Sequence, residues 1–167
     1  MTAPDTGPSW ESEQHVDAAA TAPEDFNFDA VRPLELADFL LIAEAVLGIK
    51  AKKIAEDSNL HLADSALHAP MAAFGGTEAY PDFATKAAVL GAHLVKNHPL
   101  KDGNAPVALI ATIEFCQRNG HPWTRPVGDD DGEVTAARFL ALAAEPLTDA
   151  SIDDLADWIR ERMTTLL

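Results

Sequence analysis

Residues 98–106 read His-Pro-Leu-Lys-Asp-Gly-Asn-Ala-Pro, and several of these residue types suit phosphate chemistry. At a helix N-terminus an imidazole favours its neutral form, so His98 is a candidate general base. Asp102 is a candidate Mg²⁺ ligand, because Mg²⁺ typically binds one or two carboxylates together with phosphate oxygens. Gly103 permits a positive φ and leaves room for a ligand to approach the backbone.

A helix expected directly after Gly103 would complete such a site. Its first backbone N–H groups have no partner within the helix and carry the positive end of the dipole, so they stabilise an anion. Asn104 would either bond a phosphate or cap the helix. Pro106 fits a first helical turn but removes one N–H donor. The same residues also make a good turn and cap. On these residues alone, a purely structural turn therefore remains the competing interpretation.

The segments around this loop have the periodicity of helices. No segment alternates convincingly with period two. We therefore predict an all-α bundle of about six or seven helices, with room for a short β-hairpin flap between Phe74 and Pro81. Ser151 is the predicted N-cap of the last helix. The helical segments are 33–47, 62–69, 83–97, 104–118, 133–144 and 151–163.

Composition narrows the classes of function. The 167 residues hold 27 acidic and 12 basic side chains, a net charge of −15 that opposes nucleic-acid binding. The single cysteine, Cys116, indicates a reducing compartment. No apolar segment reaches the roughly 20 residues of a membrane span, and the N-terminus lacks the features of a signal peptide. We expect a soluble cytoplasmic protein that binds neither membrane nor nucleic acid.

The first 30 residues differ in composition from the rest. They contain seven acidic residues, three prolines and no lysine or arginine. Such a segment buries too little apolar surface to fold alone. We predict a disordered acidic tail over residues 1–30, followed by one helical domain over residues 31–167.

The order and spacing of these features resemble the Fic/Doc family, and within it the short Doc (death-on-curing) branch. The family motif is approximately His-x-Phe-x-Asp/Glu-Gly/Ala-Asn-Lys/Gly-Arg, which matches the stretch that begins at His98. Upstream, Asp64-Ser65-Ala66-Leu67, Phe74-Gly75-Gly76 and Tyr80-Pro81 resemble a Doc-type run, and the downstream helix ending in residues 115–120 also fits. The resemblance covers roughly residues 33–166.

The resemblance implies a helical fold with a target-docking flap and transfer chemistry that uses ATP and Mg²⁺. Fic relatives move a nucleotide monophosphate from ATP to a protein hydroxyl. Doc relatives phosphorylate elongation factor Tu, as toxins restrained by a Phd-type antitoxin. By this likeness His98 would deprotonate the target hydroxyl and Asp102 would hold Mg²⁺. Gly103 and Asn104 would cradle the phosphate.

The chain departs from the family motif where the motif has cations. Pro106 stands in place of the motif arginine, Ala105 in place of the Doc-type lysine, and Leu100 in place of the phenylalanine. Each lost charge-assisted contact costs roughly 1.5–3 kcal/mol. Lys101 is the adjacent cation that could bind the cofactor instead, and Lys96 and Arg118 are further candidates.

Three hypotheses follow from this mixture of matches and departures. The first is a toxin-type transferase that phosphorylates or AMPylates a protein hydroxyl, attenuated by the missing cations. The alternative is a catalytically inactive Fic-fold module that binds or regulates a partner. The third is a repurposed enzyme that uses His98 on a less charged substrate.

Overall fold

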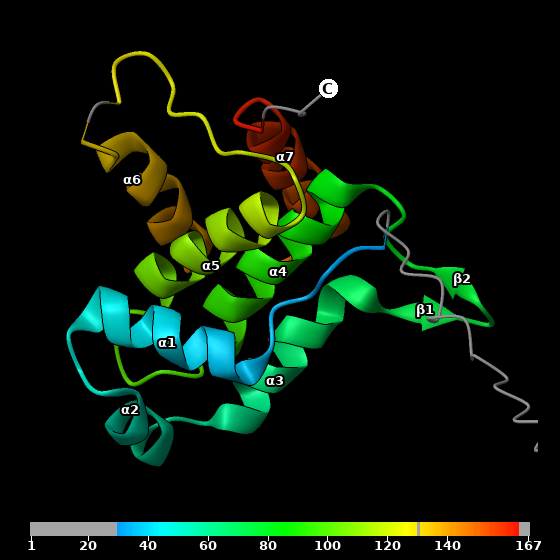
Figure 1. Cartoon of the computed structure of the whole chain (residues 1–167). Coiled ribbons are helices and arrows are strands. Elements are labelled where there is room, and N and C mark those ends of the chain that lie inside the picture. The colour runs from blue at the N-terminus through cyan, green and yellow to red at the C-terminus, as the bar shows by residue number, and fades with distance from the viewer. Residues whose placement is uncertain (1–29, 130, 164–167) are drawn as a thin grey trace, which may run out of the picture. The chain divides into compact units, whose positions relative to one another are not determined.

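Seven α-helices and one two-stranded hairpin form the part of the chain that the structure, a computed structural model, describes: residues 30–129 and 131–163 (Figure 1). This confirms the predicted helical class and the hairpin. The tail predicted for residues 1–30 lies outside the described residues except for Ala30. No helix within the described residues is long and apolar enough to cross a membrane. The elements are α1 (Leu36–Leu47), α2 (Ala51–Asp57), α3 (Leu60–His68), a 3₁₀ turn η1 (Ala69–Met71), β1 (Ala73–Phe74), β2 (Thr77–Glu78), α4 (Phe83–Asn97), α5 (Asn104–Arg118), α6 (Glu133–Leu142) and α7 (Asp149–Arg160).

The helix ends agree with the sequence signals in some places and differ in others. Gly48 ends α1 in the left-handed conformation, with φ of 68°. The short helix α2 was not predicted, because its seven residues bury a single apolar side chain, Ile54, and leave no amphipathic pattern. The predicted N-cap of α7 is wrong. Thr148 takes that position, and Ser151 completes its capping box three residues later.

Helix α4 is the centre of the fold. It packs against α3, α5, α6 and α7. Ten of its fifteen residues are buried, as expected for a helix with neighbours on several sides. Since its C-terminal end leads into residues 98–103, the core fixes the position of the segment that carries the candidate site.

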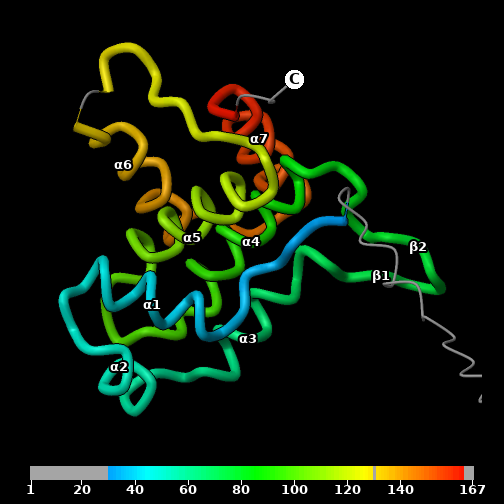
Figure 2. The backbone as a smooth tube through the Cα atoms, viewed as in Figure 1, coloured from blue at the N-terminus to red at the C-terminus, as the bar shows by residue number. Residues whose placement is uncertain are grey.

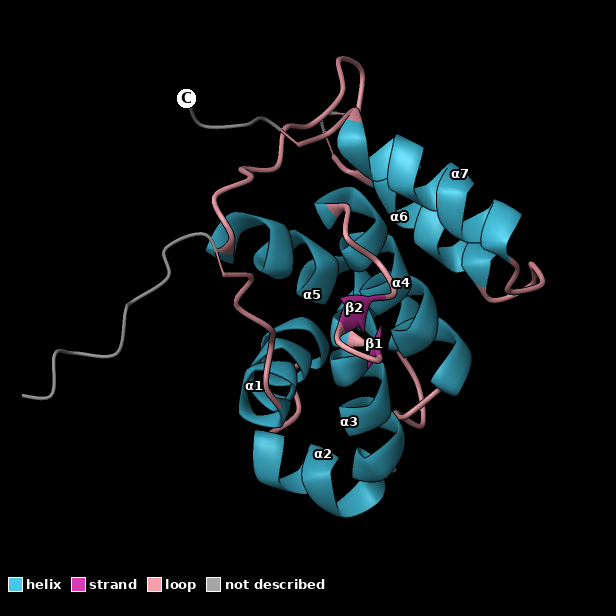
Figure 3. Ribbon diagram, turned by 90° about the vertical axis from the view of Figure 1, so that its right-hand side faces the viewer, coloured by secondary structure: helices cyan, strands magenta, loops and turns pink. Residues whose placement is uncertain are grey.

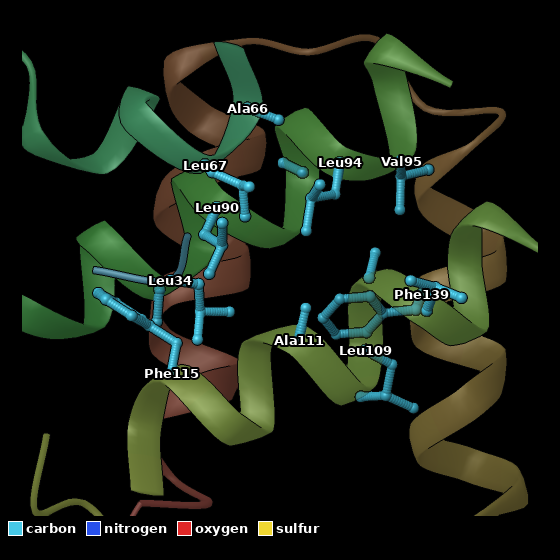
Figure 4. Close-up of a cluster of buried hydrophobic side chains, with 14 of the residues drawn as sticks. Leu34, Ala66, Leu67, Leu90, Leu94, Val95, Leu109, Ala111, Phe115 and Phe139 are labelled. Carbon is cyan, nitrogen blue, oxygen red and sulfur yellow. The ribbon is translucent and has the colours of Figure 1, made fainter. Parts of the chain in front are cut away.

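Close contact between α4 and its neighbours depends on Gly91. A Cβ atom at this position would lie 2.7 Å from Thr112 Oγ1 of α5 and 2.9 Å from Phe139 Cε1 of α6. Figure 4 shows Phe139 and Leu109 facing α4 residues across this core, with Phe115 and Leu34 at its other end. The small residue therefore lets α5 and α6 approach the central helix.

The hairpin β1–β2 projects from the helical body before α4 begins (Figure 1), and Figure 3 views it from its tip. Its pairs are Ala73 with Glu78 and Phe74 with Thr77. Its base is held by Lys86 of α4, whose side chain is only 2% exposed. The Nζ atom lies 3.2 Å from Glu78 Oε1 and 3.4 Å from the Pro70 carbonyl oxygen. A buried ammonium thus ties the hairpin to the core helix.

Candidate functional site

His98 ends α4 in a left-handed conformation, with φ of 51° and ψ of 55°. It is the only residue other than glycine with a positive φ in the described part of the chain. This conformation is sparsely populated by L-residues, although histidine tolerates it better than most. Holding a residue in this conformation lowers the stability of the fold by on the order of 1–3 kcal/mol, which the surrounding structure must offset. The imidazole is exposed to solvent.

Residues 98–103, the motif loop, are held from both sides by hydrogen bonds. The Asn59 N–H, at the start of α3, donates to the Pro99 carbonyl at 2.9 Å. The Asn97 amide donates to the Leu62 carbonyl at 3.1 Å, which fixes the end of α4 to α3. Leu100, the residue in the motif phenylalanine position, is 3% exposed and anchors the loop in the core.

Asn104 closes the motif loop onto α5. Its side-chain oxygen accepts from the Leu100 N–H at 2.9 Å, and its amide donates to the Leu100 carbonyl at 2.8 Å. The residue is only 7% exposed. Both ends of the side chain are therefore occupied by the backbone of the loop. Asn104 positions the loop, and any contact it makes with a phosphate would come from its backbone N–H.

Asp102 and Gly103 form the turn that leads from the motif loop into α5. Gly103 is the N-cap of α5, with φ of 78°. Its N–H donates to Asp102 Oδ1 at 2.8 Å, which leaves the second oxygen of this exposed carboxylate for a cation. A Cβ atom on Gly103 would clash with Leu47 Cδ2 at the end of α1. The expected room for a ligand at Gly103 is therefore filled by the Leu47 side chain. This carboxylate is the type of ligand that Mg²⁺ accepts.

The first turn of α5 contains the two positions that lack the motif cations. Ala105 is buried and Pro106 is exposed. The first N–H groups of a helix need acceptors from outside the helix. With no cation at 105 or 106, the backbone supplies the positive potential in this turn.

The cations near the candidate site come from other positions. Lys101 Nζ lies 3.5 Å from Asp57 Oδ1 of α2, with its side chain 73% exposed. Lys96 donates to the Ala143 carbonyl at 3.1 Å, and Arg118 lies at the far end of α5. Of the three cations suggested by the sequence, Lys101 alone lies in the motif loop.

A pocket of about 260 Å³ opens beside the motif loop. Leu100, Lys101 and Asp102 form one side of it. The end of α1 and helix α2 form the other side, and Figure 2 shows the loop between α4 and α5 running past these elements. The candidate site therefore has a cavity next to it, lined by a helix that the sequence pattern did not predict.

The hairpin lies far from His98 along α4. It precedes the first residue of this 15-residue helix, whereas His98 follows the last, and a helix of this length spans about 22 Å. Figures 1 and 2 both place the hairpin and the motif loop at opposite ends of α4. The structure thus brings together His98, Lys101, Asp102, Gly103 and Asn104, but not the hairpin.

Three residues at the site escaped the sequence analysis. Asn59 carries a backbone bond to the motif loop, and Lys53 and Asp57 line the pocket. Asn59 had a usable signal, since asparagine is a preferred helix N-cap. The role of α2 depends on contacts between segments about 45 residues apart, which local patterns do not reveal.

Comparisons with known proteins agree with this geometry. The model of the Fic/DOC family matches residues 33–116, half of the chain. A curated relative, Toxin Doc of Mycolicibacterium smegmatis (strain ATCC 700084 / mc(2)155), is 42% identical over 59 residues. That match covers 35% of this chain and 45% of the relative, so the chain spans under half the length of the relative it matches. No solved structure matches significantly. The family model and the helical fold around the motif loop together show that the chain belongs to the Fic/Doc family.

Proposed function

We propose that the chain is a toxin-type transferase that moves a phosphoryl or nucleotidyl group from ATP to a protein hydroxyl. The observation that carries this proposal is His98, an exposed imidazole held at a positive φ beside the N-terminus of α5. Backbone strain that the surrounding structure maintains is typical of functional sites. Family membership and the similarity to a protein named Toxin Doc also favour it.

In this proposal each residue of the loop has one role. His98 accepts the proton of the target hydroxyl, and the hydroxyl oxygen forms a bond to phosphorus. The phosphorus–oxygen bond to the leaving group breaks, which releases ADP after phosphoryl transfer or pyrophosphate after nucleotidyl transfer. Asp102 offers a free carboxylate oxygen for Mg²⁺, which would neutralise phosphate charge. Gly103 takes the positive φ that turns the chain into α5, and Asn104 fixes the loop through Leu100. Phosphoryl transfer relies mainly on such positioning and charge neutralisation.

The proposed partners follow from the family. A protein carries the hydroxyl that is modified, and elongation factor Tu is the first substrate to test. A Phd-like antitoxin is the first binding partner to test, and a cytoplasmic location would suit both. With Ala105 and Pro106 in the first turn of α5, we expect transfer slower than in a relative that has both cations.

One observation favours a second candidate function, a catalytically inactive partner-binding module. The Asn104 side chain is committed to Leu100, and the two motif cations are missing, so the fold keeps the loop without the cationic clamp. This module would bind its partner without ATP turnover. The two candidates differ in whether transfer depends on His98.

Transfer of label to elongation factor Tu separates them. The full chain is incubated with Mg²⁺ and ATP labelled in either the α- or the γ-phosphate, which also identifies the transferred group. Replacing His98 by alanine should reduce the rate by roughly 10²–10⁴, the usual contribution of a general base. His61→Ala is the matched control, because His61 is an exposed histidine of α3. Transfer that is absent with both labels argues for the module. Transfer that His98→Ala leaves unchanged overturns the role of His98 as general base.

A further inference from the structure

Two lysines from separate segments meet at one carboxylate beside the motif loop. Lys53 of α2 places its Nζ 3.1 Å from Asp57 Oδ1, and Lys101 of the motif loop lies 3.5 Å from the same oxygen. Their side chains are 60% and 73% exposed, so both ammonium groups reach solvent. All three residues line the 260 Å³ pocket.

The remaining lining of the pocket is mostly apolar. Ile54 and Leu100 are buried and form its floor, and Leu47 and Ile49 come from the end of α1 and the turn after it. Asp102 and Ser58 are the other polar residues of the lining. Small-molecule sites combine an apolar surface with a few convergent polar groups in this way. The pocket offers an apolar wall, two ammonium groups and the candidate Mg²⁺ ligand.

We propose that this pocket binds a phosphorylated ligand, with Lys53 and Lys101 holding its phosphate in place of the cations missing at 105 and 106. The inference rests on the proposed function in taking ATP as that ligand. Lysine binds phosphate as a mobile point charge, so two lysines on flexible stems can converge on it. The apolar wall would contact the part of the ligand that carries no charge.

Asp57 has a defined part in this arrangement. Its carboxylate keeps the two ammonium groups at the rim of the pocket while no ligand is bound. The hydrogen bond from Lys53, followed by the charge of Lys101, lowers the pKa of Asp57, so the carboxylate is ionised at neutral pH. A polyphosphate carries several negative charges and would displace this single carboxylate from the lysines. Asp57 is therefore a competitor of the phosphate.

Titration calorimetry of the full chain tests the proposal with two probes, MgATP and inorganic triphosphate. The double variant Lys53→Met/Lys101→Met should bind both probes at least roughly tenfold more weakly than the unmodified chain, since each charge-assisted contact carries about that factor. Lys52→Met is the matched control, because Lys52 is an exposed lysine of the same helix that does not line the pocket. It should change the affinity less than about twofold.

Asp57→Asn gives the sharper test because two roles predict opposite signs. If Asp57 competes with the phosphate, this variant should bind inorganic triphosphate several-fold more tightly. If Asp57 is instead a metal ligand, the variant should bind MgATP more weakly. Weaker binding by Asp57→Asn overturns the proposal. An affinity of the double lysine variant equal to that of the unmodified chain also overturns it, as does no binding of either probe to the unmodified chain at millimolar concentration. His98-dependent transfer decides the proposed function separately, since it is measured by label and not by affinity. Transfer with no dependence of binding on the lysines would overturn this inference alone.

Discussion

The two ends of α5 are built in contrasting ways. At its C-terminal end Arg118 makes a bidentate ion pair with Asp38, at 2.8 and 2.9 Å, and Arg32 donates to the Arg118 carbonyl at 2.6 Å. The Asn119 side chain bonds both the N–H and the carbonyl of Arg32. At the N-terminal end two residues of the motif loop, His98 and Gly103, have positive φ, and one buried side chain, Asn104, closes the loop.

The two ends differ in what their polar groups do: those at one end anchor the fold, and those at the other end are exposed to solvent. The charged groups at the C-terminal end bind residues 80 or more positions away, which fixes the segment before α1 to the core. At the N-terminal end the Asn104 side chain satisfies the backbone of Leu100, and His98 and Asp102 are exposed to solvent. Polar groups that are not used within the fold are available to a ligand. This contrast locates the candidate chemistry at the N-terminal end of α5.

Replacing Asn104 by alanine should have the largest effect on stability. The Leu100 N–H and carbonyl would lose their partners in a buried environment, and each unsatisfied group costs about 1–3 kcal/mol. We expect the free energy of unfolding to fall by about 3 kcal/mol, measured by urea denaturation. Asn97→Ala is the control, since Asn97 is half-buried and makes one bond, to Leu62. It should cost about 1 kcal/mol. Equal losses in both variants would mean that Asn104 does not hold the loop in the way its bonds indicate.

Replacing Asp38 by asparagine tests the C-terminal end of α5. Chiefly through its hydrogen bond from Arg118, the pKa of Asp38 is lowered to about 2. A lowered carboxyl pKa stabilises the fold above the unfolded-state value and loses this contribution as the pH falls through the folded-state value. At pH 7 we expect Asp38→Asn to cost about 2 kcal/mol of unfolding free energy.

The pH dependence of this variant is the sharper measurement. The difference between the unmodified chain and Asp38→Asn should shrink as the pH falls from about 4 to about 2, in thermal unfolding at each pH. Asp153→Asn is the control, because Asp153 is exposed on α7. It should stay within about 0.5 kcal/mol of the unmodified chain at every pH. A cost of Asp38→Asn that is constant with pH would show that packing, and not charge, holds this end.

The sequence predicted the helices that have a local apolar periodicity. It did not predict the contacts that have no local sequence pattern. Helices α4 and α5 have the bounds that periodicity gave them, because each has a long apolar face and a clear end at Asn97 or Asn119. The motif residues could be placed on one loop, since the loop is continuous in sequence. Neither the internal bonds of Asn104 nor the pairing of Lys101 with Asp57 has a local signature.

The smallest expected effect has the opposite sign and concerns the strain at His98. A residue with a side chain loses roughly 1–2 kcal/mol of stability at a positive φ such as that of His98, and glycine avoids this cost. Glycine also has greater freedom in the unfolded chain, which offsets part of its gain in stability. We expect His98→Gly to be about 0.5–1 kcal/mol more stable than His98→Ala in urea denaturation. Both variants lack the imidazole, so the difference between them isolates the backbone. A glycine variant that gains stability while it loses transfer would mean that the fold maintains a strained backbone to position the histidine. A glycine variant less stable than the alanine variant would show that the backbone at residue 98 is not strained, and the proposed role of His98 would then rest mainly on its solvent-exposed imidazole.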